Sequence, residues 1–423
     1  MDRSRRASSP THASRQDPGA SSQLNTPVRS GVYRSSGARS AGPLRVSTLD
    51  PRSLGPAMVE AWRALEMRAL EPNAYLSPDF VLPALKHLEP EARPLAFMVE
   101  APRLSLDKPY LVAVLVAHVS PGVLAFPLPH LRAYKSRHSY LSGLLLDREQ
   151  GSAALSALLQ HVAGESPSFN GIDFEWLWGD GECYELLREC CERLNMPVQE
   201  RHTFSRAVLF PERDREQIEE AAKAELHALR RKVRRLSEQG EVRWALAEAK
   251  DVPRAAETFM DLEHLGWKGE EGSSLRSSRT GECFFREMSA NFASRGRALF
   301  VQLLLNERVI ASTSNFSSSG CGFAFKIGWS PEFAKLSPGV LAELELMRSL
   351  ARGDANLPLA FWDSGTSEGS YLEKLWSSRR RVVTLSVASS WMGAHALRLV
   401  RVARGAKRRW AASGLTLKRT AAK

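Results

Sequence analysis

Cysteine is scarce in this sequence, and its spacing fits no common framework. The 423 residues include five cysteines, an odd number, and no Cys-x-x-Cys pair occurs. The adjacent pair Cys190 and Cys191 does not change this pattern. The spacing indicates neither a disulfide framework nor a zinc cluster, so we expect no metal. It is typical of a reducing compartment, and we expect a cytoplasmic protein.

Long apolar runs are also missing. No run approaches the ~18 residues that a membrane-spanning helix needs. Arg3, Arg5 and Arg6 have no apolar segment behind them, so they do not resemble a secretory signal. Both absences argue against a membrane-spanning or secreted protein.

Acidic residues are absent from the end of the chain. Residues 379–423 hold twelve Arg and Lys and no Asp or Glu, while the whole chain has a net charge of +11. The rest is therefore near neutral, which argues against a nucleic acid as partner of the body. Residues 391–410 predict a basic amphipathic helix whose arginines are Arg398, Arg401, Arg404 and Arg408. Such a helix either lies peripherally on an anionic membrane, here the inner membrane, or packs on the domain with a solvated basic end.

The length and the 43% hydrophobic content predict two domains with tails. Residues 1–42 are rich in Ser, Arg, Gly and Pro, and we expect a disordered basic tail there. One α/β pattern then occurs twice, over 43–212 and 213–388, and 389–423 forms the basic C-terminal helix and tail. In the first domain we expect a strand at Val46, followed by helices over 57–70, 153–162 and 184–194 and strands over 95–100, 110–119, 123–126 and 172–178.

The second domain has the clearer pattern. A helical stripe over 226–236 is followed by the order strand, two helices, three strands with hairpin spacing, helix, strand, helix, strand. The expected strands are 242–247, 299–305, 309–316, 322–327, 359–362 and 382–387, and the expected helices are 254–265, 284–294, 338–351 and 371–376. This order predicts a mixed sheet with flanking helices.

Several stretches of the second domain carry a resemblance to a known family. They are the helix over 230–236 that closes at Gly240, Leu262–Leu275, Phe284–Gly296, Phe323–Arg348 and Phe361–Arg381. They are similar to the CelD/BcsL-type acetyltransferases of bacterial cellulose biosynthesis, a branch of GNAT. The first domain resembles the family more weakly, through Trp62–Pro78 and Tyr140–Leu146.

The resemblance implies two tandem GNAT-like domains, of which the first is degenerate. It implies an acyltransferase that uses acetyl-CoA or another acyl-CoA and acts by direct attack on the thioester. The acceptor would be an amine or hydroxyl of a sugar, a lipid-linked sugar or a polysaccharide precursor. The family usually has an Asp soon after Lys326, where this chain has Gly328, Trp329 and Ser330.

Two other functions stay open. The tandem halves also resemble FemAB-type transferases, which use aminoacyl-tRNA, and the basic run Arg230–Arg235 would then be the RNA-binding surface. Alternatively, this run is simply the solvent-exposed face of a helix. The chain could also be a non-catalytic accessory protein of a polysaccharide synthase.

The segment Ser337–Leu341 suits a pyrophosphate. Ser337 is a favourable N-cap, Pro338 a favourable first helical residue, and Gly339 lets a ligand approach the backbone. Free N–H groups at a helix start attract an anion. The expected cofactor contacts are therefore Ser337, Pro338, Gly339, Val340 and Leu341. An ordinary capped helix would show the same pattern.

The resemblance places the amides that stabilise the oxyanion on the preceding strand, with cofactor contacts at Phe325, Ile327 and Gly328. Regular alternation would put Phe325 and Ile327 on one face, and Lys326 with Gly328 on the other. Lys326 would then have space beside it to contact an acceptor or the thioester oxygen. Alternatively, it is a lysine extended over a sheet face.

Two carboxylates are candidate catalytic bases. Glu263 falls in the apolar stripe of its helix, where a carboxylate must be paired, have a raised pKa or line a cleft. Asp363 ends a buried strand, the end at which ligands gather in open α/β sheets, although it could instead fix a turn. The expected substrate contacts are Trp267, Lys268, Lys326, Tyr371 and Lys374, each of which also fits a structural role.

Overall fold

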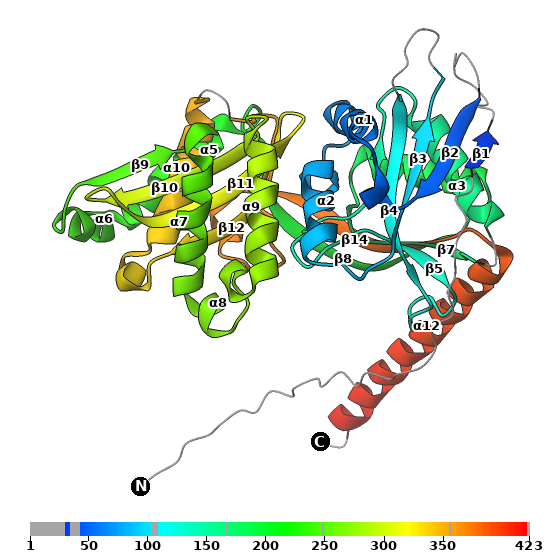
Figure 1. Ribbon diagram of the computed structural model, residues 1–423. Helices are drawn as coiled ribbons and strands as arrows, with labels where there is room; N and C mark the ends of the chain where they lie inside the picture. Colours follow the sequence, from blue (N-terminus) through cyan, green and yellow to red (C-terminus); the bar gives the residue numbers. More distant parts are fainter. Residues whose placement is uncertain are drawn as a thin grey trace.

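The computed structural model describes residues 30–33, 43–102, 109–165, 168–247, 249–354 and 357–420, with the backbone alone for 30–33 and 407–420. These residues form one mixed sheet with helices on both faces, which confirms the predicted α/β class (Figure 1). The predicted disordered tail lies outside the described residues except for Ser30–Tyr33, which form strand β1 beside β2.

The first half of the chain contains eight of the described strands and four of the described helices. The strands are β1, β2 (Leu44–Leu49), β3 (Pro94–Glu100), β4 (Leu111–Ser120), β5 (His130–Ala133), β6 (Leu145–Leu146), β7 (Gly171–Trp178) and β8 (Val198–Leu209). The helices are α1 (Pro56–Met67), α2 (Pro78–His87), α3 (Gly151–Gly164) and α4 (Glu182–Arg193).

The second half repeats this alternation. Its strands are β9 (Val242–Leu246), β10 (Ala298–Leu305), β11 (Arg308–Ser318), β12 (Cys321–Trp329), β13 (Phe361–Asp363) and β14 (Ser378–Ala388). Its helices are α5 (Arg215–Ala228), α6 (Arg230–Ser237), α7 (Val252–Leu265), α8 (Trp267–Glu270), α9 (Arg279–Ala293), α10 (Pro338–Arg352), α11 (Leu372–Leu375) and α12 (Trp391–Thr420).

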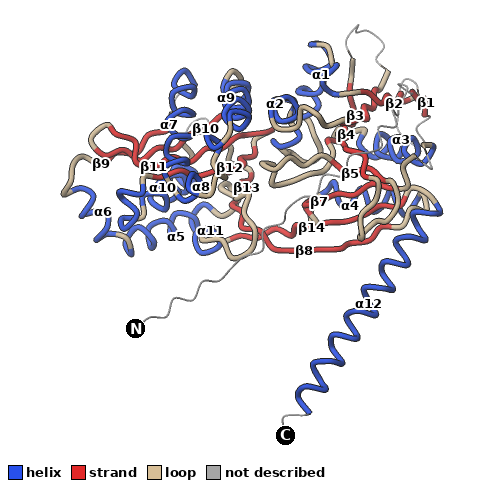
Figure 2. Tube along the Cα trace, turned by 60° about the horizontal axis from the view of Figure 1, so that its bottom comes forward, coloured by secondary structure: helices blue, strands red, loops and turns tan. Residues whose placement is uncertain are grey.

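The two halves exchange strands. Within the described residues the sheet has 14 strands in the order β1-β2-β3-β4-β5-β7-β14-β8-β13-β12-β11-β10-β9, with β6 beside β4. Strand β8 of the first half therefore lies between β13 and β14 of the second half. Strand β14 in turn lies between β7 and β8. Figure 2 shows β8 and β14 side by side as they run from one half into the other.

Helices cover both faces of the sheet. In the second half α7 and α9 cover one face of β10–β12, while α10 and α5 cover the other (Figure 1). The core under α7 and α9 continues to α1 and α2, where the Phe80 and Phe284 rings meet edge to face at 5.5 Å. In the first half α3 and α4 pack on the opposite face. One apolar core therefore spans both halves.

A buried ion network also joins the halves. Arg297, just before β10, contacts Glu66 of α1 at 2.5 Å and Asp79 of α2 at 2.6 Å. Both carboxylates are fully buried, and the Ser318 hydroxyl donates to Glu66 at 2.7 Å. Loss of Arg297 would leave two buried carboxylates without their shared cation, so the pairing fixes α1 and α2 against β10 and β11.

The predicted order of elements in the second half is confirmed, including the antiparallel hairpins β10–β11 and β11–β12. The strand expected over 123–126 is only an isolated bridge between Val123 and Phe126. Helix α2, strand β8 and helix α5 were not predicted. Pro83 inside α2 and the many polar residues of β8 weaken the sequence signal there.

Candidate acyl-transfer site

Strands β12 and β13 diverge at the centre of the second half. Their parallel pairing runs from Cys321 with Phe361 to Phe323 with Asp363, where β13 ends. Strand β12 continues to Trp329, so among the described strands none pairs with its edge beyond Phe323. The Tyr75 hydroxyl of the first half donates to the Ala324 carbonyl at 3.2 Å. This open edge provides backbone groups that a ligand can bind.

A β-bulge at Phe325 overturns the predicted alternation along β12. Ser314 of β11 pairs with Lys326, and the next residue, Asn315, pairs with Ala324, so Phe325 is the extra residue. Phe325 and Lys326 therefore both face α7 and α9, whereas Ile327 faces the start of α10. The prediction that Phe325 and Ile327 share a face is wrong.

Gly328 packs closely against α7. A Cβ atom at Gly328 would lie 2.7 Å from the Glu263 backbone nitrogen and 3.1 Å from Leu262. The space predicted beside Lys326 is thus occupied by the backbone of α7. Glycine is required at this position because helix and strand touch.

A pocket of about 230 Å³ opens at the N-terminus of α10. It brings together six of the predicted site residues from β12, the α10 start and the segment before α11: Ile327, Ser337, Pro338, Gly339, Val340 and Tyr371. Trp329 and Ala334 complete the lining. Two predicted residues do not line it, the buried Leu341 and the exposed Lys374.

Ser337 occupies the predicted N-cap position of α10 but does not cap the helix with its side chain. Its φ of 56° is left-handed, and its side chain caps no N–H of α10, because a turn of 3-10 helix leads directly into this position. Its hydroxyl instead accepts a hydrogen bond from Nζ of Lys232 on α6, at 2.7 Å. Helix geometry leaves the N–H groups of Gly339 and Val340 without an intrahelical acceptor. One lysine and two amides at a helix start favour an anion.

Glu263 is buried and fully paired. Its Oε1 lies 3.2 Å from Nζ of both Lys326 and Lys268, and its Oε2 accepts from the Leu275 N–H at 2.9 Å. Burial raises the pKa of Glu263, but the two lysines and the amide outweigh it, so that the net pKa is lowered. The structure thus brings three predicted site residues together as an ion cluster, the alternative that the sequence left open.

Asp363 lies where β12 and β13 part. Its Oδ2 is 3.3 Å from Nη1 of Arg206 on β8, and both side chains are fully buried. Its Oδ1 accepts from the Gly365 N–H at 3.0 Å, the turn contact considered from the sequence. Burial raises the pKa of Asp363, and Arg206 offsets this only in part. Between the two predicted bases, Asp363 is therefore the carboxylate that accepts a proton more readily.

The first half contributes side chains that sequence analysis missed. The His138 ring stacks on Phe284 at 5.6 Å, and burial together with Lys326 lowers the pKa of His138 to about 3. Tyr140 lies against Gly365, and burial raises its pKa to about 12. These residues lie in or beside the weakly similar stretch Tyr140–Leu146, which was the available signal.

The remaining predicted residues do not line the pocket. Trp267 is 56% exposed, with Nζ of Lys268 6.0 Å from its ring centre. Glu343, one turn after Gly339, was also missed. Its Oε1 accepts from the Trp376 indole at 3.0 Å, and burial raises its pKa to about 7. Its position in the apolar stripe of α10 could have identified it, as it did Glu263.

A known protein family matches the part of the chain that contains much of this site. Residues 224–357 match the model of the acetyltransferase (GNAT) domain. This segment is a GNAT-type acyltransferase domain. It contains Glu263, Lys326 and the start of α10, while Asp363 and Tyr371 follow it. Among curated proteins none matches the chain.

Solved structures with a similar fold include the C-terminal domain of a putative lysylphosphatidylglycerol synthetase from Agrobacterium fabrum. It has 12% identity and a TM-score of 0.47, with 82% of this chain and 95% of that chain covered. FemX has 11% identity and a TM-score of 0.48, with 78% and 94% covered. A tandem GNAT protein of clavulanic acid biosynthesis has 12% identity and a TM-score of 0.40, with 82% and 98% covered.

The Glu263 cluster predicts a pH-dependent stability. Because the pKa of Glu263 is lowered by folding, its pairing stabilises the fold above the ordinary glutamate pKa of 4.5. That stabilisation is lost as the pH falls through the lower folded value. Glu263→Gln should therefore lower the free energy of unfolding by about 2–3 kcal/mol at pH 7, and by less below pH ~4.

Urea unfolding at several pH values measures this effect. Glu332→Gln is the matched control, because Glu332 is exposed and pairs only with the exposed Arg308 among the described residues. The control should change stability by less than ~0.5 kcal/mol. The stabilising role of the cluster would be contradicted if both variants lost the same free energy of unfolding. A loss for Glu263→Gln that is constant with pH would contradict it too.

Proposed function

We propose that this acyltransferase takes its acyl group from acetyl-CoA or another acyl-CoA, which binds at the start of α10. The observation that carries the proposal is the pocket in which the N–H groups of Gly339 and Val340 lie near Lys232 and Ser337. Both amides and the lysine suit a pyrophosphate. The pantetheine arm would extend along the open edge of β12 as an added strand.

The transfer step follows from this placement. An amine or hydroxyl of the acceptor attacks the thioester carbon, and the backbone N–H groups of β12 stabilise the resulting oxyanion. The carbon–sulfur bond then breaks, CoA leaves as the thiolate, and the acceptor's proton passes to a base. We assign this proton to Asp363, because it lies at the end of β13 beside the open edge of β12 and its pKa is raised. Glu263 holds Lys326 and Lys268 in place.

The acceptor is proposed from the finer resemblance to CelD/BcsL-type enzymes. It would be a sugar, a lipid-linked sugar or a precursor of a cell-surface polysaccharide in a bacterial cytoplasm. Lys268, which pairs with Glu263, and the exposed Trp267 beside it would contact such an acceptor.

Acetyl-CoA binding tests the donor site. Lys232→Met removes the cation beside Ser337 and should weaken acetyl-CoA binding about tenfold in calorimetry, equivalent to ~1.4 kcal/mol. Gly339→Asp should abolish binding, because it puts a carboxylate at the anion site. A Cβ at Gly339 also lies 3.1 Å from Ile327 and Trp329, so thermal melting must accompany that variant.

Arg234→Met is the control for Lys232→Met. Arg234 lies on the same helix, but its side chain is 78% exposed and pairs with Glu238. Its loss removes the same charge from α6 and should leave the affinity unchanged. Unchanged affinity in both Lys232→Met and folded Gly339→Asp would rule out the start of α10 as the donor site.

We further propose that α12 holds the protein on an anionic membrane. Among the described side chains of α12, those that pack on the body lie in its first turns, as Leu397 does, and the helix projects away from the body (Figures 1 and 2). Trp391, Leu399 and Val402 are at least 70% exposed. Side chains after 406, including Arg408, lie outside the described part. In the described part of the chain, no helix combines the length and the apolar composition that a membrane span requires.

Vesicle co-sedimentation tests this contact. The protein should pellet with anionic vesicles, less so as salt rises, because screening weakens the attraction of the basic residues. Truncation after Ser390 should remove pelleting and leave acetyl-CoA binding intact. Leu399→Asp should also weaken pelleting and should leave the fold intact, since its side chain is 71% exposed. Equal pelleting with neutral vesicles, or none with either, would contradict the proposal.

A further inference from the structure

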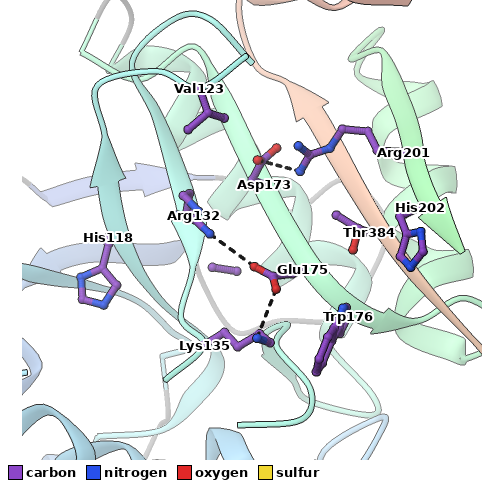
Figure 3. A pocket seen from close by; sticks show the side chains of 11 residues that line it. His118, Val123, Arg132, Lys135, Asp173, Glu175, Trp176, Arg201, His202 and Thr384 are labelled. Carbon is purple, nitrogen blue, oxygen red and sulfur yellow. Dashed lines mark hydrogen bonds and ion pairs between the residues drawn. The ribbon is translucent and has the colours of Figure 1, made fainter. Parts of the chain in front are cut away.

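A second pocket, of about 450 Å³, lies on the sheet face of the first half. Figure 3 shows its lining side chains, which come from β4, β5, β7, β8 and β14 and from segments beside them, around a common space. The lining combines cations, carboxylates, an indole and a hydroxyl: His118, Val123, Arg132, Ala133, Lys135, Asp173, Glu175, Trp176, Arg201, His202 and Thr384. Its size suits a sugar ring with a charged substituent.

Two bulges, on the strands at either side of β14, coincide at this pocket. On β7, Glu175 and Trp176 together oppose only Thr384 of β14. On β8, Arg201 is the extra residue opposite the step from Thr384 to Leu385. Consecutive residues therefore line one pocket, whereas a regular strand would point them to opposite faces. Bulges that re-aim side chains in this way are frequent beside binding sites.

Trp176 adds backbone strain at the same position. Its φ of 62° is left-handed, which costs of order 1–3 kcal/mol for a residue other than glycine. Its carbonyl accepts from the Ser142 N–H at 3.1 Å, and Nζ of Lys135 lies 4.2 Å from its ring centre. The surroundings thus hold a conformation that a structural strand would avoid.

The charges in the pocket leave an excess of cations. Arg132 and Lys135 both pair with one carboxylate, Glu175, at 3.3 and 3.1 Å. Arg201 pairs with Asp173 at 2.7 Å, while its Nε is buried without a hydrogen-bond partner in the described structure. With neutral histidines the lining carries a net charge of +1. Such a pocket offers one cation and many hydrogen-bonding groups to a ligand.

The pocket connects to the acyl-transfer site through Trp176. The guanidinium of Arg206 lies 5.6 Å from the Trp176 ring centre and pairs with Asp363. Arg206 follows Arg201 by five residues on β8, which corresponds to about 16 Å along a strand. An acceptor of two or three sugar units would span this distance.

We propose that this pocket binds the anionic sugar of the acceptor, a hexose that carries one phosphate, and that the acceptor's reactive group lies near Asp363. The proposal rests on the proposed acyltransferase function. It makes the first half the part that selects the acceptor, while the second half binds the donor.

Calorimetry with glucose 1-phosphate as the probe tests the pocket. Wild-type protein should bind glucose 1-phosphate more tightly than inorganic phosphate or glucose. Lys135→Gln with Arg132→Gln should weaken this binding at least tenfold, because both cations that share Glu175 are lost. Glu175→Gln should strengthen it several-fold, because it frees both cations for the phosphate, an effect that a purely structural ion pair would not produce.

Lys223→Gln is the matched control, because Lys223 is 68% exposed on α5 and pairs with Glu219. It should bind the probe like the wild type. The proposal would be overturned if folded wild type did not bind the probe, or if the control and pocket variants lost the same affinity for it. Displacement of the probe by CoA would overturn it as well. Acetyl-CoA binding is measured on the same samples. If the probe binds and acetyl-CoA does not, the donor assignment fails and the pocket stands.

Discussion

The reciprocal exchange of β8 and β14 is the constraint on which the rest of this structure depends. Strand β8 completes the second half between β13 and β14, and β14 completes the first half between β7 and β8. Neither half has a complete sheet alone, because without the strand from the other half its edge would expose a row of unpaired backbone groups. The Arg206–Asp363 pair, which joins β8 to β13, is buried within this exchange.

The exchange also explains why the candidate site contains residues from both halves. Tyr75 and His138 reach β12 and α9 from the first half, and Asp363 meets Arg206 from β8. Both carboxylates are buried, but their pKa values shift in opposite directions because their partners differ. Glu263, with two lysines, has a lowered pKa, whereas Asp363, with one arginine, has a raised pKa. In our account, this difference in pairing makes Glu263 a positioning residue and Asp363 the proton acceptor.

Local patterns predicted most elements of the second half, because helix and strand periodicity depend on neighbouring residues. They also placed Gly339 and Tyr371, which line one pocket. The bulge at Phe325 could not be predicted, since period-two alternation does not reveal an extra residue. The bond from Lys232 to Ser337 and the exchange of β8 and β14 join distant segments, which one sequence does not specify.

A crystal structure of the protein with CoA bound would test the central claim most directly. Our account predicts that pyrophosphate oxygens lie within hydrogen-bonding distance of the Gly339 and Val340 N–H groups, with Lys232 beside them. It also predicts that the pantetheine arm pairs with the open edge of β12, with the thiol directed toward Asp363. CoA bound with its pyrophosphate among Arg132 and Lys135 of the first half, and an empty α10 pocket, would contradict the account.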